Sequence, residues 1–382
     1  MTRLTDAERL DWLRLTRSEG VGPRTFRALL ARCGSAAAAL DALPALARRT
    51  VRVATRAEVE RELAAARRHG ARIVASIEPD YPESLRAIDS SPPLIAVRGA
   101  VEILARPMVA VVGSRNASAA GLTFTERLSR GLGEAGYVVV SGLARGIDTR
   151  AHRAALATGT VAVIAGGHDK LYPAENAGLV DAMLDAGGAV VTEMPFGWEP
   201  RAQDFPRRNR IVSGLSLGVV VIEAARRSGS LITARLALEQ GREVFAVPGS
   251  PLDPRAEGTN DLIRQGATLC AEAEHVTTVL DPLVGTPLPH ARPRGAFAEP
   301  LWDGSEDLDL STGADETGDR PQAGEGEPQD RLLTLLGPSP IAVDDLVRHS
   351  GLPARSVQTA LLELELSGRL TRHADNAVSL VR

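Results

Sequence analysis

The sequence predicts an α/β protein whose central domain is a parallel sheet with helices on both faces. Two observations support this fold class. From residue 70 to about 282, short β-branched runs such as "MVAVVG" and "TVAVIAGG" alternate with amphipathic stretches such as "GLTFTERLSRGLGEAG". The runs are apolar throughout, and strands buried on both faces belong to parallel sheets whose connections are helices.

The segments on either side of this domain have helical patterns. Residues 1–69 carry apolar side chains at helical spacing, and "GVGPRTFRALLARCGS" feeds a Gly-Pro turn into a helix. This turn is similar to that of a SAM-like or helix-hairpin-helix module, whose backbone amides can hold DNA phosphates. The alternative is that it only packs two helices together.

Residues 331–382 contain a helix-turn-helix pattern followed by a short hairpin, and they therefore predict a winged helix. The second helix of this pattern has Arg355 as its only base and is acidic at Glu363 and Glu365. This charge favours contact with a protein over contact with DNA.

Charge is unevenly distributed along the 382 residues. The chain carries a net charge of −4, but residues 299–330 hold eleven acids and one base, a net −10, which leaves +6 for the rest. Because this region is rich in Pro, Gly and acids and has no periodicity, we expect residues 283–330 to be a disordered linker. A basic body attracts phosphate, and the alternative is a scatter of solvated arginines.

The N-terminus is charged from its third residue, and no apolar run approaches the roughly 18 residues of a membrane span. We therefore expect a cytoplasmic protein. Cys33 and Cys270 lie far apart without CxxC spacing, so we expect neither a zinc site nor a disulfide framework. We also expect no cofactor.

Four loops are predicted to meet at one edge of the sheet, because ligands bind beyond the carboxyl ends of parallel strands. Glycines and hydroxyls that open helices at such an edge suit an anion. The candidate residues of these loops are Gly113, Ser114 and Arg115; Ser141, Gly142 and Gly146; Lys170; and Ser228, Gly229 and Ser230.

Lys170 is the only lysine among 44 basic Lys and Arg residues. It follows the strand "TVAVIAGG" in the loop "GGHDK". An ammonium is a compact charge on a slim stem, whereas a guanidinium is a wide planar fork. We therefore interpret Lys170 as a phosphate contact in a crowded loop, and the alternative is chance use of a lysine codon.

A further segment, "DFPRRNRIVSGLS", places Arg207, Arg208, Asn209 and Arg210 at the start of an apolar helix. We expect these residues to face phosphates, and the alternative is an arginine-rich surface loop. In "SGLARGIDTRAH", Asp148 and His152 are interpreted as a structural pair at a helix start and not as catalysts.

Known nucleotide-binding signatures are missing from these loops. Neither G-x-G-x-x-G nor G-x-x-x-x-G-K-[ST] occurs, and the strand "YVVVSG" ends in Ser141 where a dinucleotide binder carries an acid for the ribose. NAD and ATP are therefore not expected.

Six motifs resemble those of the DprA/Smf family, in order, over about residues 70–280. They are "GSR", "SGLARGIDTRAH", "GGHDKLYPAEN", "FPRRNRIVSGLS", "SGSLITARLALEQGREVFAVPGS" and "GTNDLIRQGA". The resemblance implies an extended Rossmann fold that binds single-stranded DNA, forms a homodimer, and loads the RecA recombinase onto DNA during natural transformation, without catalysis. It also implies that Arg115 and Lys170 line the pocket for single-stranded DNA.

Two other functions remain as alternatives. The fold is similar to that of lysine-decarboxylase-like phosphoribohydrolases, whose signature is PGGxGTxxE, but Thr233 stands where their catalytic glutamate belongs. Without that carboxylate the cleavage of an N-glycosidic bond lacks its acid–base residue. The second alternative, a sequence-specific regulator acting through the winged helix, is weakened by the acidic helix of that domain.

Overall fold

The computed structural model describes residues 2–47, 50–286, 327–373 and 376–381. Its N-terminal part contains α1 (Asp6–Arg17), α2 (Pro23–Cys33), α3 (Ala36–Leu46) and α4 (Arg56–Arg68). Thr5 and Thr55 cap α1 and α4, each in a capping box with the glutamate three residues later. The rings of Trp12 and Phe26 meet edge to face at 4.8 Å in the core of this helical module.

The central domain is built on a sheet of nine strands within the described residues, in the order β1-β2-β6-β5-β4-β3-β7-β8-β9. The strands are β1 (Ala71–Ala75), β2 (Leu94–Gly99), β3 (Met108–Val112), β4 (Val138–Ser141), β5 (Thr160–Val163), β6 (Ala189–Thr192), β7 (Gly218–Val221), β8 (Glu243–Ala246) and β9 (Thr268–Leu269). From β6 to β9 every neighbouring pair is parallel. The α/β fold class with a Rossmann-like core is therefore confirmed.

The edge formed by β1 and β2 corrects the expectation of a uniformly parallel sheet. Both β1–β2 and β2–β6 are antiparallel pairs. The connection after β1 contains a single helical turn, α5 (Glu83–Arg86), and its first half is hydrogen-bonded to its last residues. Ser76 N donates to Pro93 O at 2.9 Å, and Tyr81 Oη donates to Pro92 O at 2.7 Å. The chain therefore returns antiparallel beside β1, because no long helix carries it back across the face of the sheet as in a parallel connection.

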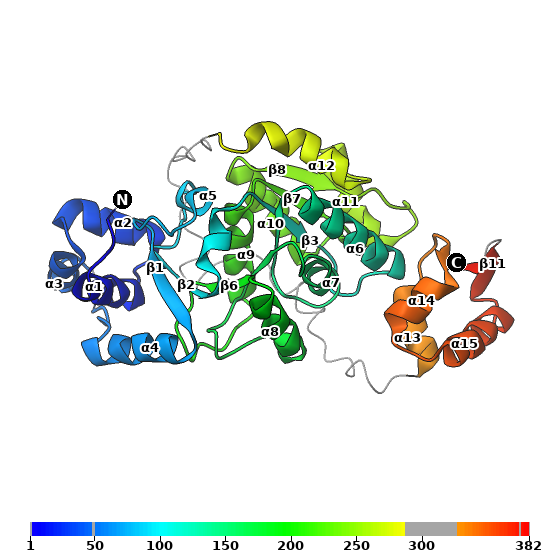
Figure 1. The fold of residues 1–382 in the computed structure, drawn as a ribbon, viewed down its shortest axis with the longest axis horizontal. Coiled ribbons are helices and arrows are strands. Elements are labelled where there is room, and N and C mark those ends of the chain that lie inside the picture. The colour runs from blue at the N-terminus through cyan, green and yellow to red at the C-terminus, as the bar shows by residue number, and fades with distance from the viewer. Residues whose placement is uncertain (1, 48–49, 287–326, 374–375, 382) are drawn as a thin grey trace.

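Helices cover both faces of the sheet (Figure 1). They are α6 (Ala119–Glu134), α7 (Ile147–Ala154), α8 (Ala177–Asp185), α9 (Asp204–Leu215), α10 (Gly229–Glu239), α11 (Glu257–Arg264) and α12 (Ala273–Leu280), with short 3-10 turns η1 (Val101–Ala105), η2 (Ala174–Asn176), η3 (Pro254–Ala256) and η4 (Asp281–Leu283).

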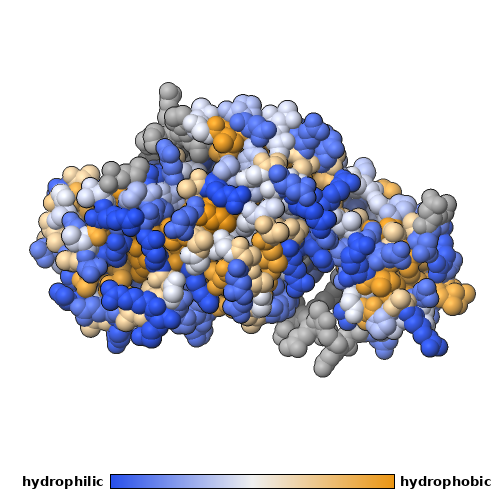
Figure 2. All heavy atoms as spheres, in the orientation of Figure 1, coloured by the Kyte–Doolittle hydropathy of each residue, from blue (hydrophilic) through white to orange (hydrophobic). Residues whose placement is uncertain are grey.

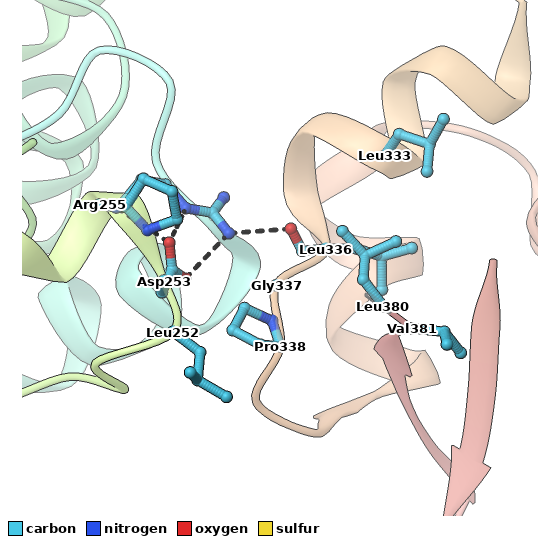
Figure 3. Close-up of a pocket in the computed structure, with 10 residues that line it drawn as sticks. Leu252, Asp253, Arg255, Leu333, Leu336, Gly337, Pro338, Leu380 and Val381 are labelled. Atoms are coloured by element: carbon cyan, nitrogen blue, oxygen red, sulfur yellow. Dashed lines mark hydrogen bonds and ion pairs between the residues drawn. The ribbon is translucent and has the colours of Figure 1, made fainter.

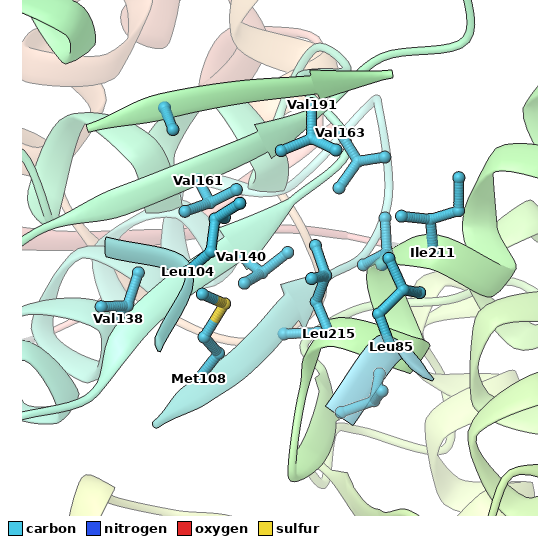
Figure 4. Packing of buried hydrophobic residues seen from close by; sticks show 14 of the residues in the cluster. Leu85, Leu104, Met108, Val138, Val140, Val161, Val163, Val191, Ile211 and Leu215 are labelled. Atoms are coloured by element: carbon cyan, nitrogen blue, oxygen red, sulfur yellow. The ribbon is translucent and has the colours of Figure 1, made fainter. Parts of the chain in front are cut away.

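The hydrophobic core lies on both sides of the strands. Val138 and Val140 of β4 pack on one side against Ile211 and Leu215 of α9 (Figure 4). Val139, between them, belongs to the cluster on the other side. Successive side chains of a strand point to opposite faces, and both faces are covered here, which explains why the strand sequences are apolar throughout.

The C-terminal part is a winged helix, as predicted. It contains α13 (Pro328–Leu335), β10 (Ile341–Ala342), α14 (Val343–Ser350), α15 (Ala354–Leu366), β11 (Leu370–His373) and β12 (Ala377–Leu380). The three strands pair antiparallel in the order β10-β12-β11. Figure 1 shows this domain at the end of the molecule opposite the N-terminal helices.

The predicted linker, residues 283–330, lies mostly outside the described residues. Where its ends are described, Leu283 closes η4, and α13 begins at Pro328, slightly before the expected start of the winged helix. In the described part of the chain no single helix is long and apolar enough to cross a membrane, and α2 with α3 reaches that length only as a pair bent by 105°. The face in Figure 2 carries hydrophilic side chains over all three domains, interrupted by smaller apolar areas.

Candidate nucleic-acid interface

The loops that follow β3, β4, β5 and β7 meet at one edge of the sheet, hereafter the rim (residues 113–116, 142–146, 164–170 and 222–228). The parallel register places these strand ends side by side. Gly146 joins two of the loops, since its φ is 70° and a Cβ there would lie 2.4 Å from Ser114 O. Only glycine allows this approach, and Ile147 N then donates to Ser114 O at 3.2 Å.

Arg115, in the first of these loops, lies beside an aromatic pair. The Arg115 guanidinium lies 5.5 Å from the centre of the Phe205 ring, and that ring lies 5.5 Å from the Tyr172 ring. Tyr172 is 50% exposed. A cation over an aromatic face is held in place by the ring quadrupole. The guanidinium of Arg115 therefore lies against Phe205, and the exposed Tyr172 ring lies on from Phe205.

Lys170 lies two residues before Tyr172, on the same loop. Its Nζ pairs with Glu199 Oε1 at 3.2 Å, and its side chain is 40% exposed. The loop beneath it is crowded, because a Cβ on Gly166 would lie 2.6 Å from Lys170 O and one on Gly167 would lie 2.4 Å from Pro195 O. The structure thus holds the lysine at the surface of a tightly folded turn.

His168 and Asp169 anchor this turn. His168 is buried, its Nε2 lies 3.1 Å from Ala96 O, and burial lowers the pKa of its ring to about 4. Asp169 accepts from Gly197 N at 2.8 Å. Both residues fix the backbone around Lys170 and so position the turn that carries the lysine.

The segment of three arginines is part of α9 and not a loop, and two of its side chains are buried. Arg208 and Arg210 are each 5% exposed. Arg210 pairs with Glu193, and Arg207 Nε lies 2.9 Å from Glu193 Oε1. This arrangement corrects the expectation that the whole arginine row faces outward. Asn209 remains partly exposed, and its Nδ2 donates to Gly229 O at 3.4 Å.

Arg208 supports the rim from inside. Its Nη1 donates to Val163 O at 2.6 Å, at the end of β5, and burial lowers the pKa of its guanidinium to about 10. Asp148 lies opposite and accepts from Gly142 N at 3.0 Å. Ser141 is fully buried, and its Oγ donates to Val111 O at 2.6 Å. These groups shape the loop after β4.

His152 is also structural. Its Nδ1 lies 2.7 Å from Thr160 Oγ1, and complete burial lowers the pKa of the ring to about 3. A buried ring that stays neutral in this way does not reach the rim. Asp148 and His152 are thus both buried and hydrogen-bonded within the fold, each to a different partner.

The start of α10 carries the remaining predicted residues. Ser228 caps the helix, and its Oγ lies 2.8 Å from Ser230 Oγ, while Gly229 between them is exposed. Arg226 pairs with Glu257 at 3.0 Å. Thr233, the position at which the enzyme alternative needs a carboxylate, is 2% exposed.

Glu223 and the aromatic pair were not identified from the sequence. Glu223 follows β7, and its carboxylate accepts from Ser118 N at 2.9 Å and from the Ser118 hydroxyl at the start of α6. A Cβ on Gly121 would lie 2.6 Å from Glu223 Cδ. The first helix after β3 thus begins against the protein's own carboxylate, at the point where Rossmann proteins hold a phosphate. An acid directly after "GVVVI" was the available sequence signal.

The fold and the rim define an extended Rossmann-like protein whose sheet edge carries cations beside an aromatic pair, between a helical module and a winged helix. The chain belongs to the DNA recombination-mediator protein A family, whose model matches residues 72–281. Models of the DprA-like N-terminal HHH domain and the DprA winged helix domain match residues 6–65 and 316–376. The predicted membership of the DprA/Smf family is thereby confirmed.

Relatives and solved structures agree with this assignment. Protein Smf of Escherichia coli K12 is 41% identical over 290 residues, which cover 75% of this chain and 72% of Smf. The X-ray structure of DNA processing protein A from Streptococcus pneumoniae has a TM-score of 0.60 and 33% identity, and the match covers 72% of this chain and 98% of that one. A structure of DNA processing protein A from Helicobacter pylori, which concerns its single-stranded DNA binding mode, has a TM-score of 0.51 and 27% identity over 56% of this chain and 96% of that one.

Proposed function

We propose that this protein binds single-stranded DNA along the rim. The observation that carries this proposal is the row formed by Arg115, Phe205 and Tyr172, with Lys170 on the same loop as the tyrosine. Cations that neutralise phosphates, interleaved with rings on which bases stack, are the combination that binds single strands without a sequence preference. A relative with a described single-stranded DNA binding mode supports the same function.

Within this function the residues have different roles. Arg115 and Lys170 contact phosphates, and Gly113, Ser114, Gly229 and Asn209 line the path of the strand. The buried residues Ser141, Arg208 and Arg210 hold the rim loops in place without touching DNA.

Two further roles follow from the family. We infer that the protein acts in the cytoplasm as a recombination mediator during natural transformation and loads RecA onto the bound strand. We also infer a homodimer formed through the sheet domain, which is supported by two exposed apolar side chains, Leu238 (60%) and Leu269 (44%), and by the edge strand β9 that contains Leu269. Sedimentation of the parent and of Leu269→Glu tests the dimer.

The test of DNA binding is anisotropy of labelled oligo-dT and of its duplex at two salt concentrations. We expect the single strand to bind more tightly than the duplex and to lose affinity as salt rises. Equal affinity for the duplex would contradict the assignment of the rim. The phosphoribohydrolase alternative is not favoured, because Thr233 supplies no acid–base group, and an assay for release of free base from nucleotides checks it.

A further inference from the structure

The winged helix contacts the sheet domain through the last turn of α14. Figure 1 shows α14 on the side of the winged helix that faces α6, and α15 farther out. Within this contact, Ala119 at the start of α6 is fully buried in the hydrophobic cluster of the winged helix. His349 of α14 contacts two helices of the sheet domain, α6 and α7. Its Nε2 lies 2.9 Å from Thr123 Oγ1 on α6, and its Nδ1 lies 2.9 Å from Arg150 Nη2 on α7.

These two contacts define the protonation state of His349. A guanidinium only donates hydrogen bonds, so Nδ1 must be the acceptor and carries no proton. Nε2 then carries the proton and donates to the Thr123 hydroxyl. Protonation of Nδ1 would remove the bond from Arg150 and would place two cationic N–H groups against each other at 2.9 Å.

The charged groups around the ring come from all three helices. Arg150 of α7 and Arg348 of α14 oppose a positive ring, while Glu126 of α6 and Asp345 of α14 favour it. Each acid already has an arginine partner, since Glu126 lies 3.8 Å from Arg150 and Asp345 lies 2.9 Å from Arg348. Burial, followed by the charge of Arg150, lowers the pKa of His349 in the docked arrangement.

A second joint lies between η3 and the end of α13 (Figure 3). Arg255, held by Asp253, donates to Thr334 O at 3.1 Å and to Leu336 O at 2.9 Å, which are carbonyls at the C-terminal end of α13. A cation suits this end of a helix. Beside it an open groove of about 340 Å³ separates Leu252 from the winged helix. The acceptors at this joint are backbone carbonyls, which do not titrate, so we look for the effect of pH at the α14 contact.

We propose that His349 is a switch that docks the winged helix on α6 and α7 while its ring is neutral and releases it when the ring is protonated. The helices α6 and α7 begin at Ala119 and Ile147, directly behind the loops of the rim. Release therefore uncovers a surface that adjoins the candidate DNA site. This proposal stands on the contacts between the domains and does not require the proposed function.

The direction of the pH effect follows from linkage. In the released domain His349 has the ordinary histidine pKa of about 6.5, and docking lowers it. Docking is therefore fully favourable above about pH 6.5 and weakens as the pH falls, by about tenfold for each pH unit, until the lowered pKa is reached.

Hydrogen exchange of the full chain at pH 8 and pH 5.5, corrected for the intrinsic rates, tests the switch. We expect the α6 peptide around Thr123 to exchange faster at pH 5.5, by up to about tenfold. In His349→Gln, the amide oxygen can accept from Arg150 and the amide nitrogen can donate to Thr123, so the peptide should stay protected at both values. His349→Arg should expose it at both. His373→Gln, on β11 of the same domain, is the control and should behave like the parent.

Protection of α15 in each variant shows that the winged helix is still folded. If His349→Arg loses that protection, the comparison of the parent with His349→Gln at pH 5.5 decides the matter alone. Equal protection of the α6 peptide in the parent at both pH values, or equal loss in the parent and His349→Gln, overturns the proposal.

Discussion

The guanidinium of Arg208 fills the space in which a side chain on Gly142 would begin. A Cβ on Gly142 would lie 2.0 Å from Arg208 Nη1, which itself donates to Val163 O at 2.6 Å. The loop after β4, the end of β5 and helix α9 are therefore interlocked at one point under the rim. Any side chain at position 142 would therefore displace the guanidinium of Arg208.

Gly142→Ala is expected to destabilise the protein by about 2–4 kcal/mol, because overpacking adds to the loss of a hydrogen bond from a buried charge. Urea unfolding measures the change in the free energy of unfolding. Gly178→Ala is the matched control, since a Cβ at Gly178 meets nothing within 4 Å. Equal stability of the two variants would show that Arg208 relaxes without cost.

Arg115→Ala and Lys170→Ala are each expected to weaken binding of oligo-dT. Each should also reduce the slope of log affinity against log salt by about 0.7, the value for one lost phosphate contact on a single strand. Lys170→Arg keeps the charge but should bind less tightly than the parent, because a wide planar fork replaces a compact ammonium. Anisotropy at four salt concentrations gives the slopes.

Arg264→Ala, at the far end of α11, is the control for these variants, and its slope should match that of the parent. If Lys170→Ala binds normally, the site is misplaced. If Lys170→Arg binds like the parent, charge alone is sufficient and the argument from shape is wrong.

Tyr172→Ala is expected to weaken single-strand binding by about 1–3 kcal/mol, the usual contribution of one stacked base, with little change in the salt slope. Tyr172→Phe keeps the ring and should bind like the parent. Phe205→Ala removes the ring beneath Arg115, so it should lower both the affinity and the slope. A change of slope in Tyr172→Ala would argue against stacking as its role.

Glu199→Gln is expected to raise the affinity for oligo-dT about two- to fivefold. Lys170 is paired with Glu199 before DNA binds, and an exposed pair of this kind is worth at most about 1 kcal/mol. The gain should be largest at low salt. Glu60→Gln, which removes an exposed ion pair with Arg56 on α4, should leave the affinity unchanged.

The stability of the protein should fall below pH 6.5 in part because of His168. Its folded pKa of about 4 lies below the unfolded value, so its neutral form is favoured in the folded protein and its contribution is lost as the pH falls from about 6.5 towards 4. The loss is about 1.4 kcal/mol for each pH unit. In His168→Asn the slope of the free energy of unfolding against pH should be smaller by the contribution of one proton. His275→Gln, at a more exposed histidine, should leave that slope unchanged.

Local sequence patterns were sufficient to predict most of the fold. Apolar runs such as "VAVV" and "YVVV" predicted buried parallel strands, because a strand covered on both faces has no polar side to show. The helix-turn-helix spacing predicted the winged helix. The strands β1 and β2 are also mostly apolar, and their antiparallel direction depended on how the connection between them closes through Tyr81 and Pro92. No local pattern contains that contact.

The candidate site, too, could be predicted from the sequence only in part. The sequence by itself determined that the loops after β3, β4, β5 and β7 share one edge, since parallel strands end together, and it identified Arg115 and Lys170. Only the tertiary structure decided that Arg208 and Arg210 turn inward, and that Phe205 lies between Arg115 and Tyr172. The direction of a side chain on α9 depends on which face of that helix the sheet covers, and on carboxylates such as Glu193 that are distant in the chain.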